Sequence, residues 1–358
     1  MDESKAEELL HAFDEKLGTY LDFTQAVHHL IETLLGEHNL RFLSVTSRVK
    51  QRESLHAKLR RPDATYVGID GVTDICGIRI ISYFAADVDA IAEVFAAEFD
   101  IDSKNSVDRR KTLDPDRFGY LSLHYVAKLS PVRLGLTEYQ RYCDCVLEVQ
   151  IRSQLQHAWA EIEHDLGYKA EVVPRPIRRR LSRVAGLLEM ADAEFDSIRT
   201  SLDMYESEVP DLILSSPSEV GIDHVSISAL ISLNALVKAV DDKIVSSLSI
   251  TLHESEDYGR NVAEAILQLG VTTIEETVRL LESQKESVAR FGIATLSDHE
   301  ELPHGVSLWL LGYVESARKG KEQLARYITE MPFAFKDVKD RDQHINEVMG
   351  HYKTATSS

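Results

Sequence analysis

The chain has 358 residues, of which 44% are hydrophobic and 28% are charged, a composition typical of a globular protein with room for two domains. Its formal net charge of −19 argues against broad, non-specific binding to a nucleic-acid backbone, which requires a basic surface. No apolar run reaches the roughly 18 residues that span a bilayer, so we expect no membrane segment. The start Met1–Lys5 lacks the basic and apolar regions of a secretory signal.

The first two hundred residues alternate between helical and strand-like patterns. Apolar residues recur at three- and four-residue steps through 2–40, which predicts a long first helix. Period-two and helical patterns then predict strands at 41–49, 78–84, 121–129 and 143–152, and helices to about 61 and over 86–98, 153–169 and 177–206. Mixed elements of this kind predict an α+β fold, in which helices pack on a mainly antiparallel or mixed β-sheet.

The character of the chain changes near Pro210. Residues 214–221 are rich in turn formers and are predicted to be a linker. Beyond it we expect helices over about 224–248, 258–292 and 305–330, with breaks at Gly270 and Gly292, and a polar tail from Lys339 that frays. The prediction is therefore a domain at 1–209 and an all-helical domain at 222–358. A passive bundle and a regulatory, oligomerising or neutralising role are both open for the second domain.

Three cysteines, an odd number, provide no disulfide framework. Reduced core thiols in a cytoplasmic protein are the favoured interpretation, and a metal site is the alternative.

The strand predicted at 143–152 has apolar side chains on one face and mainly polar side chains on the other. Its period of two places apolar residues on a core face: Cys143, Cys145, Leu147, Val149 and Ile151. Glu148, Gln150 and Arg152 fall on the other face, where they are either solvated or functional. In the helix that follows, His157, Glu161 and His164 share one side. Their spacing is not the His-Glu-x-x-His of zinc hydrolases, so a zinc site is a minor alternative.

Three further runs of the sequence contain candidate functional residues. Residues 47–58 are mainly basic and include Ser54, a composition suited to binding a triphosphate. In the run 73–79, Asp74 and Arg79 are an odd number of residues apart, so Asp74 must precede the regular strand if both serve one site. In the run 118–124, a glycine stands beside Tyr120, whose ring could stack on a base. No Gly-x-x-x-x-Gly-Lys-Ser/Thr loop occurs, which excludes a P-loop enzyme.

These blocks, in this order, resemble the synthetase domain of the RelA/SpoT alarmone synthetases. The most specific block is 147–169, Glu-Val-Gln-Ile-Arg followed by a His-Ala-Trp-Ala-Glu-Ile-Glu-His helix, and the resemblance spans about 40–200. It implies an ATP pyrophosphokinase that moves the β,γ-diphosphate of ATP to the 3′-hydroxyl of GDP or GTP. The products would be AMP and the stringent-response alarmone (p)ppGpp.

The resemblance also implies an ATP site. Arg48 and Arg79 would enclose the adenine ring between their guanidinium planes. Lys50, Ser54 and Lys58 would hold the phosphates.

The metal and acceptor sites follow from the same resemblance. Asp74 and Glu148 would be the catalytic carboxylates and would bind Mg²⁺, and Glu148 would also take the proton of the attacking hydroxyl. The acceptor nucleotide would be bound by a set of four residues: Tyr120, His124, Gln150 and Arg117.

The chain departs from the family pattern at one point. Family members that use GDP or GTP usually have Lys-x-Asn before the Gly-Tyr pair, whereas this chain has Asp116, Arg117 and Phe118. Arg117 could replace the lysine.

The alternative function is a toxin that pyrophosphorylates the 3′-CCA end of tRNA or makes adenosine alarmones, restrained by its C-terminal domain as in a toxin–antitoxin system. The basic clusters 109–111 and 175–183 would then contact the tRNA acceptor end. A catalytically silent binding module is a third interpretation, and a homo-oligomer is a further expectation.

Overall fold

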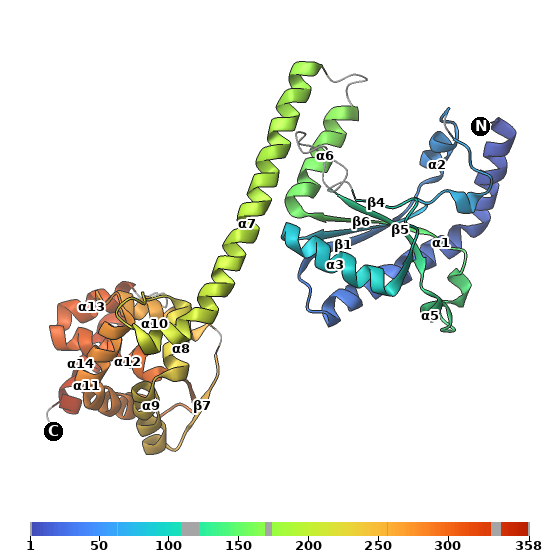
Figure 1. The fold of residues 1–358 in the computed structure, drawn as a ribbon. Coiled ribbons are helices and arrows are strands. Elements are labelled where there is room, and N and C mark those ends of the chain that lie inside the picture. Colours follow the sequence, from blue (N-terminus) through green and yellow to red (C-terminus); the bar gives the residue numbers. More distant parts are fainter. Residues whose placement is uncertain are drawn as a thin grey trace. The chain divides into compact units, whose positions relative to one another are not determined.

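The computed structural model describes residues 2–62, 64–108, 122–168, 174–255, 257–330 and 338–356. The chain divides into two compact units, residues 1–200 and 201–358, and each is described by itself. Figure 1 shows the elements of both units.

The first unit is an α+β fold, as predicted. Its strands are β1 (Phe42–Val49), β2 (Cys76–Ser82), β3 (Phe99–Ile101), β4 (Val107–Asp108), β5 (Leu123–Leu129) and β6 (Leu147–Ser153). Its helices are α1 (Glu3–Glu37), α2 (Arg52–Leu59), α3 (Ala85–Glu98), α5 (Pro131–Leu134), α6 (Gln154–Tyr168) and the first part of α7 (Arg175–Ser215), with 3₁₀ turns η1 (Ile69–Gly71) and η2 (Gln140–Tyr142).

The described strands form one mixed sheet in the order β1-β2-β6-β5-β3, with β4 paired to β5. The β2–β6 pair is parallel, and the other pairs are antiparallel. The predicted mixed sheet is therefore confirmed. Its central strands, β2 and β6, are far apart in sequence.

One face of this sheet is covered by α1 and α3. The alternating apolar residues of the strands, such as Ile78 and Val149, pack there against Phe13 and Phe23 of α1 and Phe95 of α3. These side chains are nearly or fully buried. Because neighbouring residues of a strand point to opposite faces, the polar residues between them lie on the other face.

Two expectations for the first unit are corrected. The strand predicted from residue 143 begins only at Leu147, because η2 and a turn from Tyr142 to Cys145 precede it. Cys143 is consequently exposed, whereas Cys76 and Cys145 are buried, and all three are free thiols.

Part of the apolar side of α6 is also exposed. Trp159 is buried, but Ile162 and Leu166, which lie on the same side of the helix, are exposed.

The second unit is mainly helical. Besides the end of α7, its helices are α8 (His224–Leu233), α9 (Ala235–Leu248), α10 (Tyr258–Leu267), α11 (Ile274–Thr295), α12 (Val306–Lys319), α13 (Lys321–Glu330) and α14 (Val338–Thr356). It also holds a parallel pair of short strands, β7 (Thr251–His253) and β8 (Glu301–Pro303), so it is not all-helical as expected.

The limits of several helices differ from the prediction. Helix α7 continues through Pro210 to Ser215, and Val209, which was predicted to belong to the first domain, packs in the core of the second unit. The helix expected over 224–248 is divided at Asn234, whose side chain caps α9. Gly320 separates α12 from α13.

The two glycines expected to break helices behave differently. Gly270 ends a helical segment with φ +81°. Gly292 lies inside α11, where an added Cβ would come within 2.8 Å of Leu310 and 3.0 Å of Ile244. Its small size is therefore needed for packing between helices and does not end the helix.

The polar tail was expected to fray, but α14 occupies residues 338–356. Ile345, Val348 and Ala355 are buried in the core of the unit, which explains its order.

No single helix in the described segments is long and apolar enough to cross a membrane. The pair α8 and α9, bent by 71°, meets the length and composition criteria only when taken together.

Candidate active site

The face of the sheet opposite α1 and α3 gathers polar side chains from several strands. Arg48 of β1 is paired with Gly77 of β2, and Gly77 is paired in turn with Glu148 of β6. Two residues further along, Arg79 is paired with Gln150. Directly paired residues point to the same face of a sheet, so these side chains lie together.

The two arginines line a small cavity on this face with Asp74, Glu148 and Gln150. The side chain of Arg48 passes over Gly77, where an added Cβ would lie 3.5 Å from Cγ of Arg48. The absence of a side chain at this position leaves room for the guanidinium group.

Asp74 lies just before β2, as the odd spacing from Arg79 requires if both residues serve one site. Its Oδ2 accepts hydrogen bonds from Nζ of Lys50 at 2.9 Å and Nζ of Lys58 at 2.8 Å. Burial alone would raise the pKa of Asp74, but the bonds from Lys58 and Lys50 hold the pKa below its usual value. Its Oδ1 is buried and has no hydrogen-bond partner among the described residues.

Glu148 is fixed by its neighbours on β5 and β6. Its Oε1 lies 3.4 Å from Nδ1 of His124 and 3.2 Å from Nε2 of Gln150, which donates to it. Arg152, which is buried, donates to Oε1 of Gln150 at 2.6 Å. The bond with His124 holds the pKa of Glu148 below its usual value, although burial and the carboxylate of Asp74 oppose this. The carboxylate is therefore ionised at neutral pH.

Helix α6 contributes a second set of groups. Oε1 of Glu161 forms an ion pair with the guanidinium group of Arg79 at 3.0 Å and lies 3.7 Å from Nδ1 of His157. Burial, together with the positive charge of Arg79, lowers the pKa of His157. The imidazole is therefore mainly neutral at pH 7.

A second cavity adjoins the first, since both are lined by Arg48, Arg79 and Gln150. It has a volume of about 440 Å³ and extends towards His124 and His164. The two cavities together form one polar groove across the sheet.

The structure brings together eight of the predicted site residues: Arg48, Lys50, Lys58, Asp74, Arg79, His124, Glu148 and Gln150. Ser54 lies on the exposed surface of α2, one turn before Lys58, and lines neither cavity. Tyr120 and Arg117 lie outside the described residues.

Two residues in direct contact with the site were not predicted as members of it. Arg152 supports Gln150, and Glu161 holds Arg79. A signal was present, because Arg152 continues the polar alternation of its strand and Glu161 lies on the polar side of its helix.

Comparison with known proteins identifies the first unit. The family model described as "Region found in RelA / SpoT proteins" matches residues 47–172. The chain is 32% identical over 157 residues to GTP pyrophosphokinase YjbM of Bacillus subtilis, covering 43% of this chain and 71% of that protein. It is 31% identical over 162 residues to GTP pyrophosphokinase YwaC of the same organism, covering 44% and 73%.

Among solved structures, the small alarmone synthetase 1 from Bacillus subtilis matches with a TM-score of 0.45 and 24% identity, over 54% of this chain and 99% of that one. The sequence identity to the two pyrophosphokinases, over more than two thirds of each, shows the family. This chain belongs to the RelA/SpoT family.

Proposed function

We propose that the chain is a GTP pyrophosphokinase that transfers the β,γ-diphosphate of ATP to the 3′-hydroxyl of GDP or GTP and releases AMP. One observation carries the proposal: Arg48 and Arg79 lie beside the carboxylates Asp74 and Glu148 in one cavity on a single face of the sheet. The two curated relatives, both GTP pyrophosphokinases, support the choice of acceptor.

The ATP end of the groove is assigned to Arg48 and Arg79. Guanidinium planes stack on aromatic rings, and these two side chains rise from neighbouring strands. The phosphates would extend towards Lys50 and Lys58, which now bond to Asp74. This arrangement supplies positioning and positive charge, which are the main demands of phosphoryl transfer.

Asp74 and Glu148 fit the requirements of a divalent-cation site. The buried Oδ1 of Asp74 lacks a partner among the described residues, and the negative charge of Asp74 acts on Glu148 nearby. Carboxylate oxygens are the ligands that Mg²⁺ prefers. A bound Mg²⁺ would neutralise charge on the phosphate oxygens.

Glu148 is the proposed general base. It is ionised at neutral pH and is oriented by His124 and Gln150. The 3′-oxygen of the acceptor would form a bond to the β-phosphorus of ATP while the bond from that phosphorus to the α,β-bridging oxygen breaks. The hydroxyl proton passes to the carboxylate of Glu148, and AMP leaves with the bridging oxygen.

The acceptor nucleotide is assigned to the second cavity, beside His124, Gln150 and Arg152. Its base-stacking partner is proposed to be Tyr120, with Arg117 near its phosphates; both residues lie outside the described segments.

The family model ends at residue 172, so the second unit has no assigned role. A regulatory, oligomerising or neutralising role for it remains a proposal. A cytoplasmic location likewise remains a prediction, and the three free thiols are in keeping with it.

The test is transfer of label from γ-³²P-ATP with Mg²⁺ to GDP, GTP, ATP and bulk tRNA in parallel. We expect label on GDP or GTP, and a fall of about 10²- to 10⁴-fold in rate for Glu148→Gln. The matched control is Glu37→Gln, an exposed residue of α1, which should leave the rate unchanged. Label on tRNA or ATP alone, or normal turnover by Glu148→Gln, would refute the proposal.

A further inference from the structure

Helix α7 carries an apolar stripe with the period of a coiled coil. Starting at Ile177, every residue reached by alternating steps of four and three positions is apolar: Leu181, Val184, Leu188, Ala191, Phe195 and Ile198. A repeat of 3.5 residues sustained over three heptads is typical of a helix that pairs with another helix.

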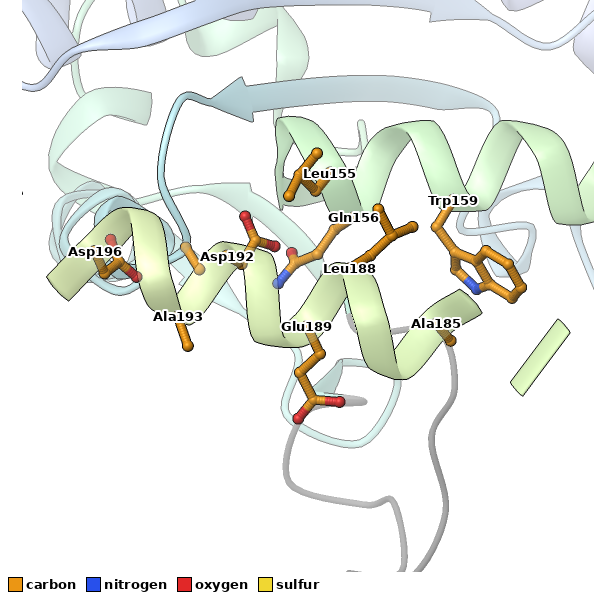
Figure 2. Close-up of a pocket in the computed structure, with 10 residues that line it drawn as sticks. Leu155, Gln156, Trp159, Ala185, Leu188, Glu189, Asp192, Ala193 and Asp196 are labelled. Atoms are coloured by element: carbon orange, nitrogen blue, oxygen red, sulfur yellow. The ribbon is translucent and has the colours of Figure 1, made fainter. Parts of the chain in front are cut away.

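The inner edge of this stripe is already covered. Figure 2 shows Leu188 and Asp192 of α7 facing Gln156 and Trp159 of α6. Asp192 is buried and accepts a hydrogen bond from Oγ of Ser153 at 2.7 Å. This side of α7 is therefore fixed against its own unit.

The outer edge of the stripe is exposed. On this edge Val184, Phe195 and Ile198 of the stripe are 46%, 49% and 47% exposed. Leu187 and Met190, which lie beside the stripe on the same side of the helix, are 64% and 68% exposed. Among the described residues of the first unit, no element covers them. A continuous apolar strip of this kind marks an interaction surface more often than a free face.

The charges on α7 are separated along its length. Residues 175–183 contain five arginines and no acid, whereas residues 189–196 contain four acids and no base. Arg180 and Glu194 are each seven residues, about two turns, from Leu187. All three therefore lie on nearly the same line of the helix, within the exposed edge.

The charge pattern of α7 is complementary to that of a second α7 that runs in the opposite direction. A second α7 running antiparallel, with a two-fold axis at Leu187, would place Arg180 opposite Glu194 of the second copy at both ends. A parallel partner would place arginines opposite arginines and acids opposite acids. Self-complementary surfaces of this kind are the basis of two-fold symmetric dimers.

We propose that two copies of this chain pair through the outer edges of their α7 helices, antiparallel, about a two-fold axis at Leu187. The apolar stripe provides the contact area, and the Arg180–Glu194 pairs set the direction and the register. The proposal does not depend on the activity of the first unit.

Charge reversal in the full-length chain tests the direction of pairing. In light scattering coupled to size exclusion, Arg180→Glu and Glu194→Arg should each weaken the dimer by about tenfold or more, because two attractive contacts become repulsive. Mixing the two variants should restore the dimer, since each contact then joins opposite charges. Arg175→Glu, which lies about 120° round the helix from that line, is the control and should dimerise normally.

Cysteine cross-linking tests the register, in a Cys143→Ser background that removes the exposed native thiol. Leu187→Cys should cross-link to itself. Arg180→Cys and Glu194→Cys should cross-link when mixed, but neither should do so alone. A monomeric wild-type chain, or dimers that neither charge reversal weakens, would overturn the proposal and point to another occupant of the stripe.

Discussion

Gly77 allows a graded test of the proposed ATP site. A Cβ at this position would lie 3.5 Å from Cγ and 3.6 Å from Nε of Arg48, which are ordinary contact distances, so alanine fits. Valine adds methyl groups about 1.5 Å beyond Cβ, with little rotational freedom to avoid the arginine. The guanidinium group would then have to leave its place over Gly77. Valine also suits a central strand, so the sheet should persist.

The expected effect follows from the contact that Arg48 would lose. A guanidinium group over an aromatic ring contributes about 0.5–2 kcal/mol, which corresponds to about 2- to 30-fold in affinity. We therefore expect Gly77→Val to raise KM for ATP by about tenfold and Gly77→Ala by less than about threefold. KM for GDP should change little in either variant, because Arg48 is assigned to the donor nucleotide.

The assay is steady-state formation of (p)ppGpp with ATP varied at saturating GDP, and then the reverse. Circular dichroism and thermal melting of both variants show whether the fold is retained. An unchanged KM for ATP in a folded Gly77→Val protein would refute the contact between Arg48 and ATP. An equal rise in KM for both nucleotides would mean that the whole face of the sheet had been disturbed.

Two further predictions concern a pKa and a packing contact. The bond from His124 holds the pKa of Glu148 below its usual value, so His124→Phe should raise that pKa and move the acid limb of the pH–rate profile towards neutral pH; an unmoved limb would contradict the role of Glu148 as the base. Gly312→Ala should destabilise the second unit by about 2 kcal/mol in denaturant unfolding, because a Cβ there overlaps the buried ring of Tyr327. Gly18→Ala is the matched control within α1: nothing lies within 4 Å of its added Cβ, so it should stabilise by about 0.5–1 kcal/mol, and destabilisation by both changes would refute the packing argument.

Local periodicity correctly predicted the helices and strands whose structure does not depend on residues far away in the sequence. The alternation of Leu147, Val149 and Ile151 predicted a half-buried strand, and all three are buried against the helices. The parity argument for Asp74 and Arg79 also needed only the geometry of a strand.

Errors arose where a distant residue decides the structure. Gly292 resembles a helix terminator in sequence, but the space it leaves is filled by Leu310 of another helix. The tail is polar overall, and the few apolar residues that order it, such as Ile345 and Val348, acquire their partners only in the folded unit.

The composition of the site was predictable, but its arrangement was not. The sequence identifies Glu148 and His124 as candidates, yet only the strand order β1-β2-β6-β5-β3 places them on adjacent strands. That order requires the parallel β2–β6 pairing, which joins residues about seventy positions apart. No local pattern specifies such a pairing, because its stability comes from the packing of the whole sheet.

The lysines illustrate a further limit of prediction from sequence. The resemblance assigns Lys50 and Lys58 to phosphate groups and Asp74 to a cation, whereas in the structure the three side chains bond to one another. Both arrangements obey the same rule, since a partly buried charge is costly unless it has an opposite charge beside it. In the structure, the carboxylate and the ammonium groups meet this requirement for each other. A triphosphate and a divalent cation arriving together would supply a new partner to each side, whereas ATP alone would take the lysines and leave Asp74 uncompensated.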